Sequence, residues 1–97
     1  MLEKVIEQHL MKKVKTVGGV AYKFTSPQRR SVPDRLCLFP GGYMVFVEVK
    51  NEKGKMSSGQ ERERQRLIDL GFPVFVVRSK EEVDHLVASY TLEGGRI

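Results

Sequence analysis

Two acids and a lysine in the middle of the chain have the residue types and the spacing of a chemical site. Pro33-Asp34 is followed fourteen residues later by Glu48-Val49-Lys50. Side chains alternate along a strand, so Glu48 and Lys50 would project from the same face of a sheet. Unpaired buried charge is costly, and polar groups at the end of an apolar strand therefore indicate a functional role.

Hydrolysis of a phosphodiester requires this set of groups. Asp34 and Glu48 would hold Mg²⁺, a hard cation that prefers oxygen ligands and keeps several waters. The metal would polarise the phosphate and lower the pKa of a bound water. Lys50 would orient that water or stabilise the charge that builds on the phosphate. The alternative for Glu48 and Lys50 is an ordinary solvated pair on an edge strand.

The length of a predicted hairpin loop decides whether Asp34 can join Glu48. Residues 34–39 and 43–50 have the composition of strands, and Pro40-Gly41-Gly42 separates them. A three-residue loop places Asp34 opposite Glu48, with Cβ atoms about 5 Å apart. A two-residue loop would place Asp34 opposite Val49, on the other face. The chemistry favours the three-residue loop, in which Phe39 faces Tyr43.

The N-terminal third of the chain is predicted to supply one helix and one strand. Apolar residues recur every three or four positions over the first seventeen residues, which is typical of a helix, and Gly18-Gly19 ends it. Residues 20–24 have the length of a strand. Residues 25–33 contain two prolines, two serines and an arginine pair, which predicts a loop.

After the hairpin, the sequence predicts a helix, a strand and a last helix. The first helix would begin at Ser57 or Ser58 and end near Gly71, residues 74–77 form a wholly apolar strand, and Ser79 begins the last helix. The tail from Glu93 is expected to be frayed. The order α-β-β-β-α-β-α indicates one mixed α/β domain over residues 1–97.

Four sequence blocks resemble a known nuclease family. Pro-Asp followed by Glu-x-Lys resembles the PD…ExK signature of the restriction-endonuclease-like superfamily, and nearly the whole chain resembles its VRR-NUC branch. The blocks are Glu3-x-x-Ile6, Val32-Pro33-Asp34-Arg35-Leu36, Val47-Glu48-Val49-Lys50 and Ser57-x-x-Gln60. Many members have glycine where this chain has Val32, which could alter the turn into Asp34 but removes no ligand. The implied fold is a mixed β-sheet flanked by helices.

The resemblance implies roles for residues of the hairpin. Asp34 and Glu48 would be metal ligands, Val49 would ligate through its backbone carbonyl, and Lys50 would be the catalytic lysine. Small members of this branch resemble phage-encoded Holliday-junction resolvases that act as homodimers with Mg²⁺ or Mn²⁺. The resemblance therefore implies branched DNA as the substrate and a phage-encoded protein in a bacterial host.

The helices would contribute two further groups to the site. Gln60 would point toward the metal, and Glu3 would add an acid from the first helix, with Glu7 one turn later as its alternative. Ser57-x-x-Gln60 is also a capping box, in which the glutamine reaches back to the N-cap amide. If Ser58 caps the helix instead, Gln60 is released toward the metal, and this second arrangement is the one expected here.

A basic surplus favours a polyanionic partner. Seventeen Lys and Arg against twelve Asp and Glu leave a net charge of +5, and neutralised phosphates release counterions from nucleic acid. Arg29, Arg30 and Arg35 flank Asp34 and are expected to contact DNA phosphates. The alternative for these arginines is a solvated run of charge.

The composition argues against a disulfide-linked protein and against a membrane protein. Cys37 is the single cysteine, which excludes an internal disulfide. No apolar segment approaches the roughly 20 residues that span a bilayer, so a cytoplasmic protein without a membrane is expected. His9 and His85 lack a second metal ligand at useful spacing and are assigned no role.

The sequence as a whole predicts a Mg²⁺-dependent endodeoxyribonuclease that acts on branched DNA. The alternatives are a monomeric flap or single-strand nuclease and a non-catalytic nucleic-acid-binding module. A chain of 97 residues has a small core, so a homodimer is expected. The last helix offers an apolar stripe for that contact, although packing on its own sheet would explain the stripe equally well. Its members are Val83, Leu86, Val87 and Tyr90.

Overall fold

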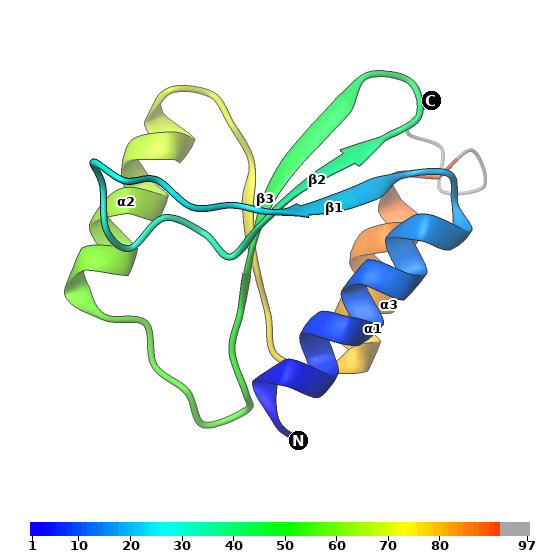
Figure 1. Ribbon diagram of the computed structural model, residues 1–97, viewed down its shortest axis with the longest axis horizontal. Coiled ribbons are helices and arrows are strands. Elements are labelled where there is room, and N and C mark those ends of the chain that lie inside the picture. Colours follow the sequence, from blue (N-terminus) through cyan, green and yellow to red (C-terminus); the bar gives the residue numbers. More distant parts are fainter. Residues whose placement is uncertain (92–97) are drawn as a thin grey trace.

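A twisted four-stranded sheet forms the centre of the computed structural model, which describes residues 1–91 (Figure 1). The strands, which lie side by side in chain order, are β1 (Val20–Lys23), β2 (Arg35–Phe39), β3 (Tyr43–Val49) and β4 (Val74–Val77). The pairs β1–β2 and β2–β3 are antiparallel, and β4 runs parallel to β3. The helices are α1 (Glu3–Thr16), α2 (Ser58–Asp69) and α3 (Lys80–Ser89).

The predicted order of elements and the mixed α/β class are confirmed. Strand β1 ends at Lys23, and β2 begins at Arg35, one residue after Asp34. The expected fraying of the tail from Glu93 lies outside the described residues. In residues 1–91 no helix combines the length and the apolar content that crossing a membrane requires.

The hairpin between β2 and β3 has the three-residue loop that the chemistry favoured. Phe39 pairs with Tyr43, and Arg35 pairs with Val47 at the other end of the ladder. Gly41 and Gly42 close the loop with φ angles of 92° and 86°, a left-handed conformation that glycine adopts at little cost. This register brings Asp34, the residue before β2, beside Glu48.

One face of the sheet carries the main apolar core. The odd-numbered residues of β3, Val45, Val47 and Val49, are buried against α1 and α3, which also pack against each other. In Figure 1 these two helices lie together on one side of the sheet. Residues 83, 86, 87 and 90 are buried in this core, which accounts for the apolar stripe of the last helix. The stripe is therefore not available as a dimer surface.

The other face of the sheet is covered by α2 and by the segment between β1 and β2. Phe46 of β3 packs here between Phe24 and Phe72, with ring centroids 5.4 Å and 6.3 Å from its own. No residue of α2 is buried. Because side chains alternate along β3, Glu48 projects from this same face as Phe46.

Candidate functional site

Glu48 is the buried acid of the described structure. It is the penultimate residue of β3 and is only 2 % exposed. The pKa of Glu48 is raised to about 8, chiefly by burial and then by a hydrogen bond with the neighbouring Asp34 and by the charge of Asp34. The charge of Lys50 acts in the opposite direction. Glu48 Oε1 has no hydrogen-bond partner within residues 1–91.

Asp34 is held beside Glu48 by the ends of two strands. Its Oδ2 accepts a hydrogen bond of 2.8 Å from the backbone N–H of Val49. Its backbone carbonyl accepts from the N–H of Phe24 at 3.0 Å. A carboxylate fixed at both its backbone and its side chain loses little further freedom when it binds a cation.

Lys50 directly follows β3 and is only partly exposed. Its backbone N–H donates to the carbonyl of Val77 at 3.0 Å, so the parallel neighbour β4 holds this residue in place. Alternation places its side chain on the face that Glu48 occupies. The influence of its charge on the Glu48 carboxyl agrees with that placement.

The donor set at this point of the sheet fits a hard divalent cation. A cation would supply the partner that Glu48 Oε1 lacks and would relieve the repulsion between Glu48 and Asp34. No cluster of three or more His, Cys, Asp or Glu suited to a metal exists among residues 1–91. Mg²⁺ is commonly held by one or two carboxylates together with waters and substrate phosphates, so two acids suffice.

The two acids of the first helix lie in different surroundings. Glu3 is exposed in the first turn of α1. Glu7 Oε2 instead accepts a hydrogen bond of 2.7 Å from Nε of Arg35. The positive charge of Arg35 thus compensates Glu7, and a metal-ligand role for Glu3 or Glu7 stays a prediction.

The same contact corrects the expectation that Arg35 faces DNA. Its side chain is 11 % exposed. Besides Glu7, it donates from Nη1 to the carbonyl of Ala21 at 3.2 Å. Arg35 thus ties α1 and β1 to β2, and its guanidinium points away from solvent. Sequence spacing from Asp34 gave no sign of this partner, which lies twenty-eight residues away.

Gln60 takes part in the capping box that was the less expected alternative. Ser57 Oγ accepts from the N–H of Gln60 at 3.1 Å, and Gln60 Oε1 accepts from the N–H of Ser57 at 2.9 Å. The expectation that Ser58 caps the helix was wrong, since Ser57 caps α2. The side-chain oxygen of Gln60 is therefore engaged at the helix end, and only its amide nitrogen remains for another role.

Arg29 and Arg30 lie exposed on the segment between β1 and β2, as expected. They line a hollow of about 350 Å³ together with residues of α2. Two of these, Arg62 and Arg66, were not predicted from the sequence to be functional residues. Their spacing of four residues places them on one side of a helix, but which side could not be deduced.

Arg78 is a third residue whose role the sequence did not predict. Its Nη1 donates to the backbone carbonyls of Asn51, at 3.1 Å, and of Gly54. These contacts anchor the loop that follows Lys50 to the end of β4. Arg78 therefore positions the chain next to the site without belonging to it.

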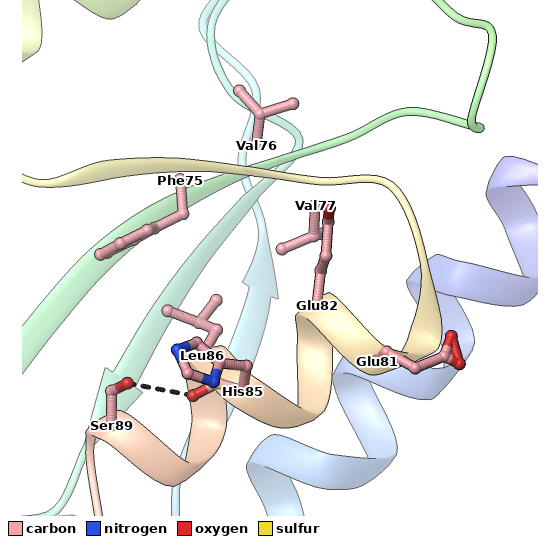
Figure 2. A pocket seen from close by; sticks show the side chains of 8 residues that line it. All are labelled: Phe75, Val76, Val77, Glu81, Glu82, His85, Leu86 and Ser89. Carbon is pink, nitrogen blue, oxygen red and sulfur yellow. Dashed lines mark hydrogen bonds between the residues drawn. The ribbon is translucent and has the colours of Figure 1, made fainter.

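A second hollow, of about 500 Å³, lies between β4 and α3 and carries no comparable chemistry (Figure 2). Phe75, Val77 and Leu86 form much of its wall, and Glu81, Glu82 and His85 lie along α3. Glu82 is already engaged, because its Oε1 accepts from the N–H of Arg78 at 2.7 Å. This hollow lies on the α3 side of the sheet, away from the face of Glu48.

Comparison with known proteins agrees with this geometry. No family model matches the chain. "Putative nuclease p44" of Acyrthosiphon pisum secondary endosymbiont phage 1 is 48 % identical over 79 residues, which cover 81 % of this chain and 85 % of that protein. A solved structure described as a "VRR_NUC domain" superposes with a TM-score of 0.85 at 35 % identity, over 91 % of this chain and 96 % of that one. This protein therefore belongs to the VRR-NUC family of nucleases, with the restriction-endonuclease-like fold.

Proposed function

We propose that this nuclease is a Mg²⁺-dependent endonuclease that hydrolyses phosphodiester bonds in branched DNA, with four-way junctions as its preferred substrate. The observation that carries the proposal is the buried Glu48, whose Oε1 lacks a partner, beside the fixed carboxylate of Asp34. A buried acid pair of this kind destabilises a fold unless a cation or a proton neutralises part of its charge. Mn²⁺ is expected to substitute for Mg²⁺, since both prefer carboxylate and water ligands.

The residues of the site divide the work of hydrolysis among them. Bound Mg²⁺ supplies Lewis-acid chemistry toward the scissile phosphate and a water. Asp34 and Glu48 would hold the ion, with the backbone carbonyl of Val49 as a further ligand. Lys50 would place its ammonium against the attacking water or the phosphate, where negative charge increases in the transition state. Gln60 would reach the substrate only through its amide nitrogen.

A homodimer would provide the two cuts that a four-way junction requires. A twofold axis relates two identical sites, so paired cuts fall on opposite strands. The edge strand β1 is the surface best suited to that contact, because within residues 1–91 it pairs only with β2 and, unlike the other edge strand β4, it exposes large apolar side chains. Val20 and Tyr22 of β1 are 38 % and 56 % exposed, and Met11 nearby on α1 is 41 % exposed. An open edge with apolar side chains is a template for pairing with a second copy.

The test is cleavage of labelled four-way junction, flap and linear duplex of matched sequence, in Mg²⁺, in Mn²⁺ and in EDTA. We expect paired symmetric cuts in the junction, slower cutting of the other substrates, and none in EDTA. Light scattering of the protein and of a Val20→Lys/Tyr22→Lys variant accompanies the assay, with Leu70→Lys as the control at another exposed apolar residue. A monomer near 11 kDa that cuts flaps but not junctions would replace this proposal by a flap nuclease.

A further inference from the structure

The hollow between α2 and the segment before β2 is bordered by four arginines. Arg29 and Arg30 come from the segment, and Arg62 and Arg66 come from α2. The single acid in its wall is Glu63, whose side chain is 11 % exposed. Four positive charges against one negative charge make this a concentrated positive region on a protein of net charge +5.

The arginines of the hollow are left largely without partners in the chain. Arg29 Nε lies 3.9 Å from Glu63 Oε1, a long ion pair. Within residues 1–91, Arg30, Arg62 and Arg66 form no ion pair. Like charges gathered in this way repel one another unless an anion lies between them. The hollow is therefore suited to an anion that several guanidinium groups can share.

Backbone features hold the two sides of the hollow together. Ser31 has a φ of 66°, a left-handed conformation that is uncommon for a residue other than glycine. The segment approaches α2 so closely that a Cβ at Gly59 would lie 2.9 Å from Ser31 Oγ. The N–H of Arg29 also donates to Ser26 Oγ at 3.3 Å, within a turn of the same segment. The arginine pair is thus placed over α2 by the chain itself.

The hollow lies a short way along the chain from the acid pair. Ser31 in the wall is three residues from Asp34, and three residues span at most about 11 Å when fully extended. Successive phosphates of one DNA strand rise about 3.4 Å along the axis of the duplex. A strand whose phosphate lies at Asp34 and Glu48 would therefore bring a phosphate only a few nucleotides from that point to the hollow.

We propose that Arg29, Arg30, Arg62 and Arg66 form a second phosphate-binding site, which holds the DNA backbone a few nucleotides from the cut. The site rests on the proposed function for its ligand, because DNA is the polyanion that the acid pair would cleave. It adds to that function a fixed point for the cleaved strand. Guanidinium groups bind phosphate oxygens in a forked geometry without reading sequence, so this contact would position the strand rather than select its bases.

The test measures DNA binding in EDTA, so that it does not depend on cleavage. Affinity for a four-way junction and for a duplex is titrated at several salt concentrations for the wild type and for Arg62→Ala/Arg66→Ala. Each phosphate contact contributes about 0.9 to the log–log slope, so we expect the slope to fall by roughly one to two units. Both arginines are exposed, and circular dichroism would verify that the variant keeps its fold.

The matched control is Lys12→Ala/Lys15→Ala, which removes two exposed charges from α1 on the other face of the sheet. This control should leave the slope unchanged, and Arg62→Lys/Arg66→Lys should keep most of it. An unchanged slope for Arg62→Ala/Arg66→Ala, or an equal fall for the lysine control, would overturn the proposal. The two proposals can fail separately. If the protein cuts no DNA, but the salt dependence of its DNA binding falls in Arg62→Ala/Arg66→Ala and not in the lysine control, the proposed nuclease substrate is refuted and this binding site is still supported.

Discussion

β3 turns one set of side chains toward α1 and α3 and the other set toward α2, and the two sets differ in kind. Val45, Val47 and Val49 on the first face lie in a continuous apolar core. Phe46 and Glu48 on the second face are equally well buried, yet one of them is an acid. A single strand of seven residues thus contributes both to the core and to the proposed active site.

The difference between the faces lies in what covers them. Helices α1 and α3 contribute nonpolar side chains that fill the first face, among them Leu10 and Leu86. Helix α2 buries none of its residues, and it is rich in arginine. An apolar cover favours close packing, whereas a polar and partly open cover leaves room for a cation and a charged substrate. The position of Glu48 is therefore unfavourable for stability and favourable for function.

Removal of an acid from the second face should have the largest effect. We expect Glu48→Ala or Asp34→Ala to lower the cleavage rate on the order of 10³-fold or more, because each removes a proposed metal ligand. DNA binding in EDTA should remain close to that of the wild type. Substantial Mg²⁺-dependent cleavage by either variant would show that the acid pair is not the catalytic centre.

Truncation on the first face should instead affect stability. Leu10 is fully buried in α1, and Leu10→Ala should lower the free energy of unfolding by about 2–5 kcal/mol. The exposed Leu70 offers a control: Leu70→Ala should change the free energy of unfolding by about 0.5 kcal/mol or less. Urea denaturation measures both. The cleavage rate per folded molecule should be the same in Leu10→Ala as in the wild type. A large loss of this rate would contradict the assignment of stability to the first face and of catalysis to the second.

Lys50→Ala tests the electrostatic contribution at the end of β3. The rate at saturating Mg²⁺ should fall on the order of 10²-fold, because a preorganised positive charge is lost from the transition state. Single-turnover kinetics over a range of Mg²⁺ concentrations would separate the rate from metal binding. An unchanged rate would show that Lys50 is a solvated residue at the end of β3 with no role in catalysis.

The smallest effect expected is a gain in the stability of the protein when the buried acid of the second face, Glu48, is replaced by glutamine. Glu48 has a pKa of about 8 in the fold against an ordinary value of 4.5, so the folded state keeps a proton that the unfolded chain loses. The free energy of unfolding in EDTA should therefore fall as pH rises from about 4.5 to about 8. Glu48→Gln should remove this slope and raise stability near pH 8 by about 0.5–2 kcal/mol. Thermal melts across this pH range provide the measurement, and a slope that persists in Glu48→Gln would assign it to another group.

Local signals in the sequence were sufficient to predict most of the fold. Apolar periodicity located α1 and α3, and the two glycines after Pro40 predicted the hairpin whose register brings Asp34 to Glu48. Periodicity succeeds because burial of one side of a helix or strand requires it. The pairing of Asp34 with Glu48 could also be predicted from a local signal, because the register of the two strands depends on a loop of only three residues.

The tertiary structure decided which partner each polar side chain takes when several are available. Ser57 and Ser58 are both legitimate caps, and the structure selected Ser57 together with Gln60. Arg35 lies next to Asp34 in sequence, but Glu7 on a distant helix lies within 2.7 Å of it. The meeting of Arg29 and Arg30 with α2 likewise depends on how a loop crosses a helix. The energies of such contacts depend on distances between segments far apart in the chain, and no local pattern encodes those distances.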